Sequence, residues 1–411
     1  MAEVCMYFQV HQPNRLRKYQ VFDINQNHDY FDAEKNENIC KKVAKNCYLP
    51  ANKIILNEIK KRELKVSFSI TGSALEQFEK YSPEVIESFK ELAKTGRVEF
   101  LAETYYHSLS YLYSEEEFRS QVEMHRRKIK ELFGVEPKVF RNTELIFNNL
   151  LVEQLKDMDF KAVLAEGADH ILGWRSPDYV YSSQGNEPKL LLRNYKLSDD
   201  IAFRFSDKQW KEYPLNAEKF ANWVRGSSGQ VVNLFMDYET FGEHHSADSN
   251  IFIFLENLPS EILNNGMNFV TPSEIAEKFE SKGELDLPDH VSWADSEKNL
   301  SAWLGNAMQE NAMKELYLLE KAVKETGDKK LLEDWRMLTM SDHFYYMSTK
   351  WFSDGHVHSY FNPFDNPYEA FIAYMNILND IIARITNAGV KAESGKMITE
   401  NPHAVVNSGK K

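Results

Sequence analysis

The amino-acid sequence predicts an α/β protein in which a TIM-type barrel is followed by a C-terminal helical bundle. In the first 280 residues, short apolar segments of strand length alternate with longer amphipathic segments, the rhythm of βαβ units in a parallel sheet. The strand segments are apolar on both faces, as expected for parallel strands that are covered on both sides. No GxGxxG follows the first strand, which favours a barrel over a doubly wound sheet.

Seven or eight strands are expected, each a short apolar run. They lie at residues 3–10, 64–70, 98–103, 138–142, 160–167, 189–194, 201–206 and 231–237. Helical segments separate them, at residues 51–63, 82–96, 114–134, 216–226 and 269–279. Capping boxes mark the starts of two of these helices, Ser114 with Glu117 and Thr271 with Glu274. After residue 280 only helical periodicity remains, at residues 300–326, 329–352 and 366–389.

These patterns divide the chain into three parts. Residues 1–280 are predicted to form the barrel, and residues 281–390 a helical domain packed on it. Residues 391–411 are polar and aperiodic, which is typical of a disordered tail.

Composition limits the partners. The 49 basic and 62 acidic side chains give a net charge of −13. This charge argues against nucleic acid and anionic membranes as binding partners, but it does not affect the binding of a neutral substrate. The N-terminus lacks a signal peptide pattern, no apolar stretch is long enough to span a bilayer, and three cysteines do not make a disulfide framework. We therefore expect a cytoplasmic protein. The sequence indicates no cofactor and leaves the oligomeric state open.

Polar and titratable side chains gather where the predicted strands end. They are Gln9 with His11, Glu103 with His107, Arg141 with Glu144, and Asp237 followed by Glu239, Glu243, His244 and His245. The carboxyl ends of barrel strands carry the active site. Two carboxylates from different strands are what glycoside hydrolysis requires, one to attack or stabilise the anomeric carbon and one to protonate the departing oxygen. Aromatic residues make up 13% of the chain and supply rings that stack on sugars.

Five motifs, four of them at or near predicted strands and one in the helical part, resemble glycoside hydrolase family 57, a group of retaining α-glucan enzymes. They are "HQP" at 11–13, "GRVEF" at 96–100 with His107, "FRNTE" at 140–144, "MDYETFGEH" at 236–244 and "AWLGN" at 302–306. The stretches "EGADHILGWR" at 166–175 and "LSDDIAFRFS" at 197–206 look like the α-amylase branch. The resemblance covers about residues 4–390.

That resemblance implies a (β/α)7 barrel, with Glu144 as the nucleophile and Asp237 as the acid/base. It also implies that His11 and His107 bind the sugar at the cleavage point. We take Gln9, Glu103, Trp174, Arg204, Trp303, Trp351 and Asp354 as further substrate-binding candidates. The segment at residues 351–364 lies between two predicted helices, so we hypothesise that it caps the barrel mouth and that Asp354 reaches the substrate.

Simpler interpretations exist for several of these residues. Glu144 could be an ordinary acid in the first turn of a helix, and His11 a core histidine. Trp303 and Trp351 are more often core residues of a bundle than sugar platforms. His244 and His245 have no third ligand at a recognisable spacing, so no metal site is predicted.

The function predicted from the sequence is α-amylase action on α-1,4-glucan such as starch, glycogen or maltodextrin. It would proceed through a covalent intermediate on Glu144. The same chemistry leaves a 4-α-glucanotransferase or a branching enzyme as alternatives. More remote ones are a metal-dependent polysaccharide deacetylase or mannosidase, and a glucan-binding protein without activity. The motif at His11 lacks the Asp that the metal enzymes need.

Overall fold

The structure is a computed structural model that describes residues 1–183, 188–350 and 361–392. Its strands form two four-stranded sheets. The first has the order β3-β2-β1-β8, with β1 Glu3–Val10, β2 Val66–Ile70, β3 Val98–Phe100 and β8 Val231–Asp237. The second has the order β4-β5-β7-β6, with β4 Val139–Arg141, β5 Ala162–Glu166, β6 Tyr181–Ser182 and β7 Lys189–Arg193. All pairings are parallel except that of β6 with β7, which confirms the predicted α/β class.

Backbone hydrogen bonds join the two sheets at both ends of the strand order. The Ala102 amide donates to the Val139 carbonyl, and the Arg141 amide donates to the Ala102 carbonyl, which ties the end of β3 to β4. On the other side the Asn194 amide donates to the Asn233 carbonyl, which ties the end of β7 to β8. The carboxyl ends of the seven parallel strands therefore point to one end of the molecule.

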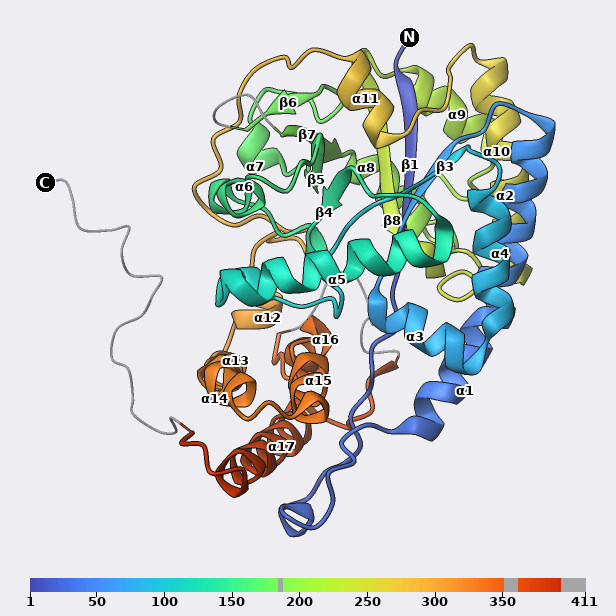
Figure 1. The fold of residues 1–411 in the computed structure, drawn as a ribbon. Coiled ribbons are helices and arrows are strands. Elements are labelled where there is room, and N and C mark those ends of the chain that lie inside the picture. The colour runs from blue at the N-terminus through green and yellow to red at the C-terminus, as the bar shows by residue number, and fades with distance from the viewer. Residues whose placement is uncertain (184–187, 351–360, 393–411) are drawn as a thin grey trace, which may run out of the picture.

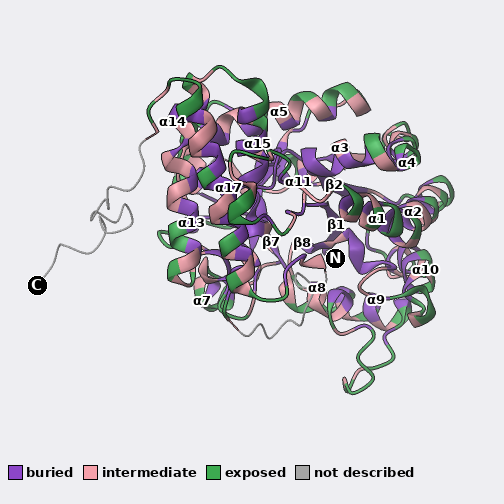
Figure 2. Cartoon of the chain, turned by 90° about the horizontal axis from the view of Figure 1, so that it is seen from below, coloured by how far each residue is buried: buried purple, intermediate pink, exposed green. Residues whose placement is uncertain are grey.

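Helices cover the outside of the strands (Figure 1). They are α1 Ala33–Val43, α2 Leu49–Lys61, α3 Gly72–Tyr81, α4 Pro83–Ala93, α5 Glu115–Phe133, α6 Asn149–Leu155, α7 Asp169–Leu172, α8 Tyr195–Ala202, α9 Ala217–Arg225, α10 Ile251–Asn264 and α11 Pro272–Lys278. Figure 2 shows buried central strands surrounded by helices with exposed outer faces. The predicted capping boxes begin helices, although Ser114 caps α5 without a reciprocal bond from Glu117, while Thr271 and Glu274 make the complete box of α11.

The C-terminal helices lie at the carboxyl ends of the strands, below them in Figure 1. They are α12 Ser301–Leu304, α13 Ala307–Leu318, α14 Glu320–Glu325, α15 Lys329–Leu338, α16 Ser341–Tyr345 and α17 Pro367–Asn387. A single apolar cluster joins side chains of the second sheet, such as Phe140 and Val163, to Trp335 and Tyr374 of these helices. The predicted helix at 329–352 is interrupted at Met340, whose backbone ψ of 135° is not helical. Met340 therefore separates α15, which ends at Leu338, from α16, which begins at Ser341.

The strand predicted at residues 201–206 is wrong. Ile201 and Ala202 are the last residues of α8, and no strand follows them before Val231. The apolar positions that suggested alternation, Ile201 and Phe205, are both buried and lie four residues apart, which is also a helical spacing. The side chain of Asn194 starts this helix by accepting a hydrogen bond from the Leu197 amide.

Among the helices within the described ranges, none combines the length and the apolar character that crossing a bilayer requires.

Candidate active site

A cleft lies where the carboxyl ends of the strands meet the C-terminal helices. Its lining is rich in carboxylates, imidazoles and aromatic rings. The lining residues are Gln9, His11, Gln12, Pro13, Arg15, His107, Glu144, Asp237, Glu239, His244, Trp293, Asp342, Tyr346 and Phe361. Both predicted catalytic carboxylates thus line one cleft, although Glu144 follows β4 and Asp237 ends β8.

Glu144 stands on a tight turn directly after β4. Its φ of 57° and ψ of 25° place it in the left-handed region, which costs a residue other than glycine free energy. The turn is held by the Leu145 and Ile146 amides, which donate to the carbonyls of Asn142 and Thr143. These hydrogen bonds hold the left-handed backbone of Glu144 in place, and the turn directs its side chain into the cleft.

Two side chains from other parts of the chain hold the carboxylate of Glu144. Nε2 of His107 lies 2.9 Å from Oε1, and the indole Nε1 of Trp293 donates to Oε2 at 2.7 Å. The backbone strengthens this contact, since the Trp293 amide donates to the Glu144 carbonyl. Both oxygens are therefore fixed before any substrate enters.

His107 lies between two carboxylates, because its Nδ1 is 3.3 Å from Oε2 of Glu103. Burial disfavours the charged imidazole, but the hydrogen bonds to Glu103 and Glu144 outweigh it and raise the pKa of His107 to about 9. Burial likewise opposes the charge of Glu103, yet His107 and Arg141 lower the pKa of this carboxyl below its usual value. At neutral pH His107 is a cation that donates a hydrogen bond to each carboxylate.

Arg141 adds a second positive charge beneath the cleft. Its side chain is buried, and its guanidinium lies 4.7 Å from the centre of the Trp293 ring. None of its three guanidinium nitrogens has a hydrogen-bond partner among the described residues. Arg193 lies 5.7 Å from the centre of the same ring. Trp293 is thus held by two guanidinium groups as well as by Glu144.

Gln9 joins the end of β1 to this network. Its Nε2 donates to both oxygens of Glu103, at 3.1 and 3.3 Å, and its Oε1 accepts from the hydroxyls of Tyr7 and Ser69. Strand register also places Gln9 opposite Asp237 of β8. Gln9 therefore connects the buried Glu103 to the strand end that lies beside Asp237.

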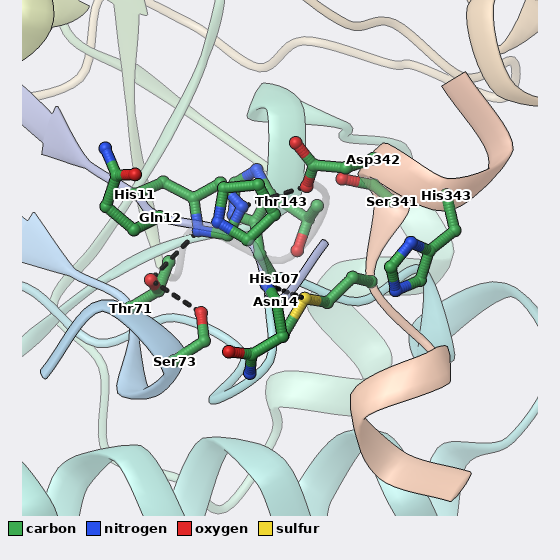
Figure 3. Close-up of polar contacts among 12 residues, drawn as sticks. His11, Gln12, Asn14, Thr71, Ser73, His107, Thr143, Ser341, Asp342 and His343 are labelled. Carbon is green, nitrogen blue, oxygen red and sulfur yellow. Dashed lines mark hydrogen bonds and ion pairs between the residues drawn. The ribbon is translucent and has the colours of Figure 1, made fainter. Parts of the chain in front are cut away.

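His11 packs directly on His107, with ring centres 4.1 Å apart. Burial and the charge of His107 lower the pKa of His11, so that His11 is neutral. Its Nε2 lies 2.9 Å from Oδ2 of Asp342, and its Nδ1 lies 2.9 Å from the hydroxyl of Thr71 (Figure 3). Since a carboxylate only accepts, the Nε2 proton goes to Asp342 and Nδ1 accepts from Thr71. His11 thus connects the strand ends to helix α16.

Asp237 shares its part of the cleft with a second acid. Glu239 lies on the 3-10 turn Tyr238–Thr240 and is buried, and Tyr48 donates a hydrogen bond to its Oε1. Burial, with a further contribution from the charge of Asp237, raises the pKa of Glu239 to about 8.

Several other predicted substrate-binding residues are not part of the cleft lining. Glu103 is fully buried and contacts Gln9 and His107 from below. Trp303 is 1% exposed in the core shared with the C-terminal helices, because the start of α12 faces inward. Trp174 is 92% exposed on the surface, and Arg204 pairs with Asp200 one helical turn away. Trp351 and Asp354 lie outside the described residues, while Phe361 of the same segment lines the cleft.

The part of the chain that the structure describes holds no group of three or more His, Cys, Asp or Glu side chains arranged to bind a metal ion.

Comparison with known proteins identifies the family. The sequence model of glycosyl hydrolase family 57 matches residues 5–288. The chain belongs to glycosyl hydrolase family 57. A relative from Methanocaldococcus jannaschii, which carries the provisional name α-amylase, is 45% identical over 406 residues. That match covers 95% of this chain and 86% of the relative.

Solved structures of other family 57 enzymes share the fold. A branching enzyme from Thermococcus kodakaraensis matches with a TM-score of 0.65 at 13% identity, over 94% of this chain and 90% of that one. A 4-α-glucanotransferase from Thermococcus litoralis matches with a TM-score of 0.63 at 18% identity, over 84% of this chain. The matched region is 56% of the glucanotransferase, so this family 57 chain spans little more than half of its length.

Four residues of the family 57 cleft were missed by the sequence analysis: Trp293, Asp342, Arg15 and Tyr346, the last of them inside the helix predicted at 329–352. Trp293 lies in an irregular segment after α11, where no periodic pattern draws attention to it. Asp342 is in the first turn of α16, where an acid is ordinarily explained by the helix dipole. Arg15 follows the "HQP" motif by two residues, and that proximity was the one available signal.

Proposed function

We propose that the protein is a retaining glycoside hydrolase of the α-amylase type that acts on α-1,4-glucan. The observation that carries the proposal is that Glu144 and Asp237 line one cleft, each at the end of a different strand. The relative named as an α-amylase supports the same activity. A pair of carboxyl groups across a sugar ring is the requirement of glycoside hydrolysis by double displacement.

Glu144 is the proposed nucleophile, and its surroundings suit this role. An attacking carboxylate has to be ionised, and the cation of His107 at 2.9 Å favours the ionised form. Trp293 restrains the other oxygen at 2.7 Å. Attack gives a glycosyl ester of Glu144. The hydrogen-bond donors His107 and Trp293 remain in place and stabilise the carboxylate that forms again when water releases the sugar.

Asp237 is the proposed acid/base. It protonates the glycosidic oxygen in the first step and removes a proton from water in the second. Gln9, His11 and His107 are proposed to bind the sugar at the cleavage point, since all three line the cleft. Glu103 acts beneath them by holding Gln9 and His107.

We infer that the two sheets together form an incomplete (β/α)7 barrel. Seven parallel strands, joined at both sheet edges by the hydrogen bonds at Ala102 and Asn194, support this arrangement. On this view residues 1–280 are the catalytic barrel and residues 281–390 a helical domain that completes the cleft through Asp342 and Tyr346. The buried free thiols of Cys5, Cys40 and Cys47 suit the cytoplasm, where we expect the enzyme to act.

The test is Glu144→Gln with maltoheptaose, starch and glycogen as substrates. The variant should lose at least about 10³-fold in turnover while it remains folded at the assay temperature, as judged by a cooperative unfolding transition. Glu63→Gln, at an exposed carboxylate outside the cleft, is the matched control and should keep full turnover. Wild-type turnover in Glu144→Gln would refute the assignment.

Analysis of the products separates hydrolysis from its alternatives. Short maltooligosaccharides indicate an α-amylase, products longer than maltoheptaose a glucanotransferase, and new α-1,6 linkages a branching enzyme. Activity that EDTA does not change is expected for this mechanism, whereas loss of activity would support a metal-dependent deacetylase or mannosidase instead.

A further inference from the structure

The carboxyl group of Glu239 lines the cleft but has no role in the proposed mechanism. It lies two residues after Asp237, lines the same cleft and is 7% exposed. Two ionised carboxylates at such a site would repel each other strongly, because burial reduces solvent screening. A pair of this kind therefore tends to keep one proton between its members.

A directed row of hydrogen bonds ends at Glu239. The amide Nε2 of Gln12 donates to the hydroxyl of Tyr48 at 2.9 Å, so the one proton of that hydroxyl is left to donate to Oε1 of Glu239. At the other end, Nη2 of Arg15 donates to Oε1 of Gln12 at 3.4 Å, which fixes the orientation of the amide. Since Oε1 accepts this bond, the proton of a neutral Glu239 is carried by Oε2.

The groups around Glu239 set where the proton resides. Burial and the charge of Asp237 raise the pKa of Glu239 to about 8, against the hydrogen bond of Tyr48 and the backbone amides of Glu239 and His11, which favour the ionised form. The other titratable neighbours, Cys47 and Tyr238, are buried and have pKa values raised well above their usual ones, so they stay neutral. His244 also lines this cleft, and Arg15 is the cation at the far end of the row.

We propose that Glu239 is the proton store of Asp237, holding on Oε2 the proton that Asp237 receives when a glucan chain enters the cleft. This rests on the proposed function. Asp237 then gives the proton to the glycosidic oxygen as its bond to the anomeric carbon breaks and that carbon bonds to Glu144. In the second step, a water molecule gives a proton to Asp237, and the oxygen of that water bonds to the anomeric carbon as the ester bond to Glu144 breaks. The proton then returns from Asp237 to Glu239. Glu239 is thus a positioning residue that acts through Asp237.

Two conservative variants should move the alkaline limb of kcat/KM for maltoheptaose in opposite directions. Glu239→Gln is nearly isosteric but cannot hold or release a proton, so the shared proton is lost and the limb moves down by about one to two pH units. Tyr48→Phe removes a hydrogen bond that favours ionised Glu239, so the limb moves up by as much as about one unit, until the loss of the His107 proton near pH 9 limits activity. Structural damage alone would lower the rate without opposite shifts.

A substrate that needs no acid isolates the proton step. α-Maltosyl fluoride loses fluoride without protonation, so at pH 7.5 Glu239→Gln should match the parent on it within about 2-fold, while losing about 10-fold or more on maltoheptaose. An alkaline limb that Glu239→Gln leaves in place, or equal losses on both substrates, would overturn the proposal. Failure of the proposed function looks different: the wild type would hydrolyse neither substrate, or Glu144→Gln would retain turnover on both.

Discussion

Replacement of His107 by glutamine tests the electrostatic account of the nucleophile. The pKa of His107 is about 9 in the folded protein, against the ordinary value of 6.5. Because folding raises this pKa, the folded state binds the proton more tightly. The resulting stabilisation is complete below pH 6.5 and is lost as the pH rises through 9. A difference of this size corresponds to about 3 kcal/mol in the free energy of unfolding.

The measurement is the free energy of unfolding by urea at a series of pH values from 6.5 to 9.5. The wild type should be more stable than His107→Gln by an amount that shrinks by about 3 kcal/mol across this interval. Any pH-independent cost of packing glutamine at this position cancels, because only the change of the difference with pH is used. Full reversibility has to be shown at each pH.

His343→Gln is the matched control for this experiment. Burial lowers the pKa of His343 to about 4, so its titration lies below the interval and its difference from the wild type should stay constant. Parallel curves for the wild type and His107→Gln would refute the conclusion that His107 is a cation between Glu103 and Glu144.

Further predictions concern side chains that the sequence analysis missed or misplaced. Trp293→Phe keeps the ring but loses the indole donor, so we expect kcat to fall about 10- to 100-fold with maltoheptaose at an almost unchanged melting temperature. Asp342→Asn weakens the anchor of His11 and should lower kcat/KM about 5- to 30-fold in the same initial-rate assay. Trp303→Ala leaves a cavity in the core and should cost about 3–5 kcal/mol in chemical denaturation, whereas Trp174→Ala on the surface should cost almost nothing.

The sequence predicted the strand ends well because strand alternation and local motifs carry that information. Gln9 and His11 are two residues apart at the end of β1, and both line the cleft as alternation requires. Residues 201–206 show the limit of the method. An apolar pair four positions apart fits the edge of a helix as well as a strand, and here the helix cap at Asn194 decides the outcome.

Strand alternation and local motifs could not identify the residues that join the site from distant segments of the chain. Trp293 is 149 positions from Glu144, and Asp342 is 331 positions from His11. Neither lies in a pattern that distinguishes it from an ordinary loop tryptophan or a first-turn acid. Their importance arises only when folding brings α16 and the segment after α11 against the strand ends, which is tertiary information.

The described surroundings of the two predicted catalytic carboxyl groups differ in charge. On the side of Glu144, charges alternate from the interior outward: the cation Arg141, the anion Glu103, the cation His107 and then Glu144, the proposed nucleophile. On the side of Asp237, the cleft holds a second, buried acid, Glu239, and no ion pair joins Glu239 to a cation among the described residues. A cation favours loss of a proton and a buried acid favours its retention. This difference supports the proposed roles, in which Glu144 attacks and Asp237 donates a proton.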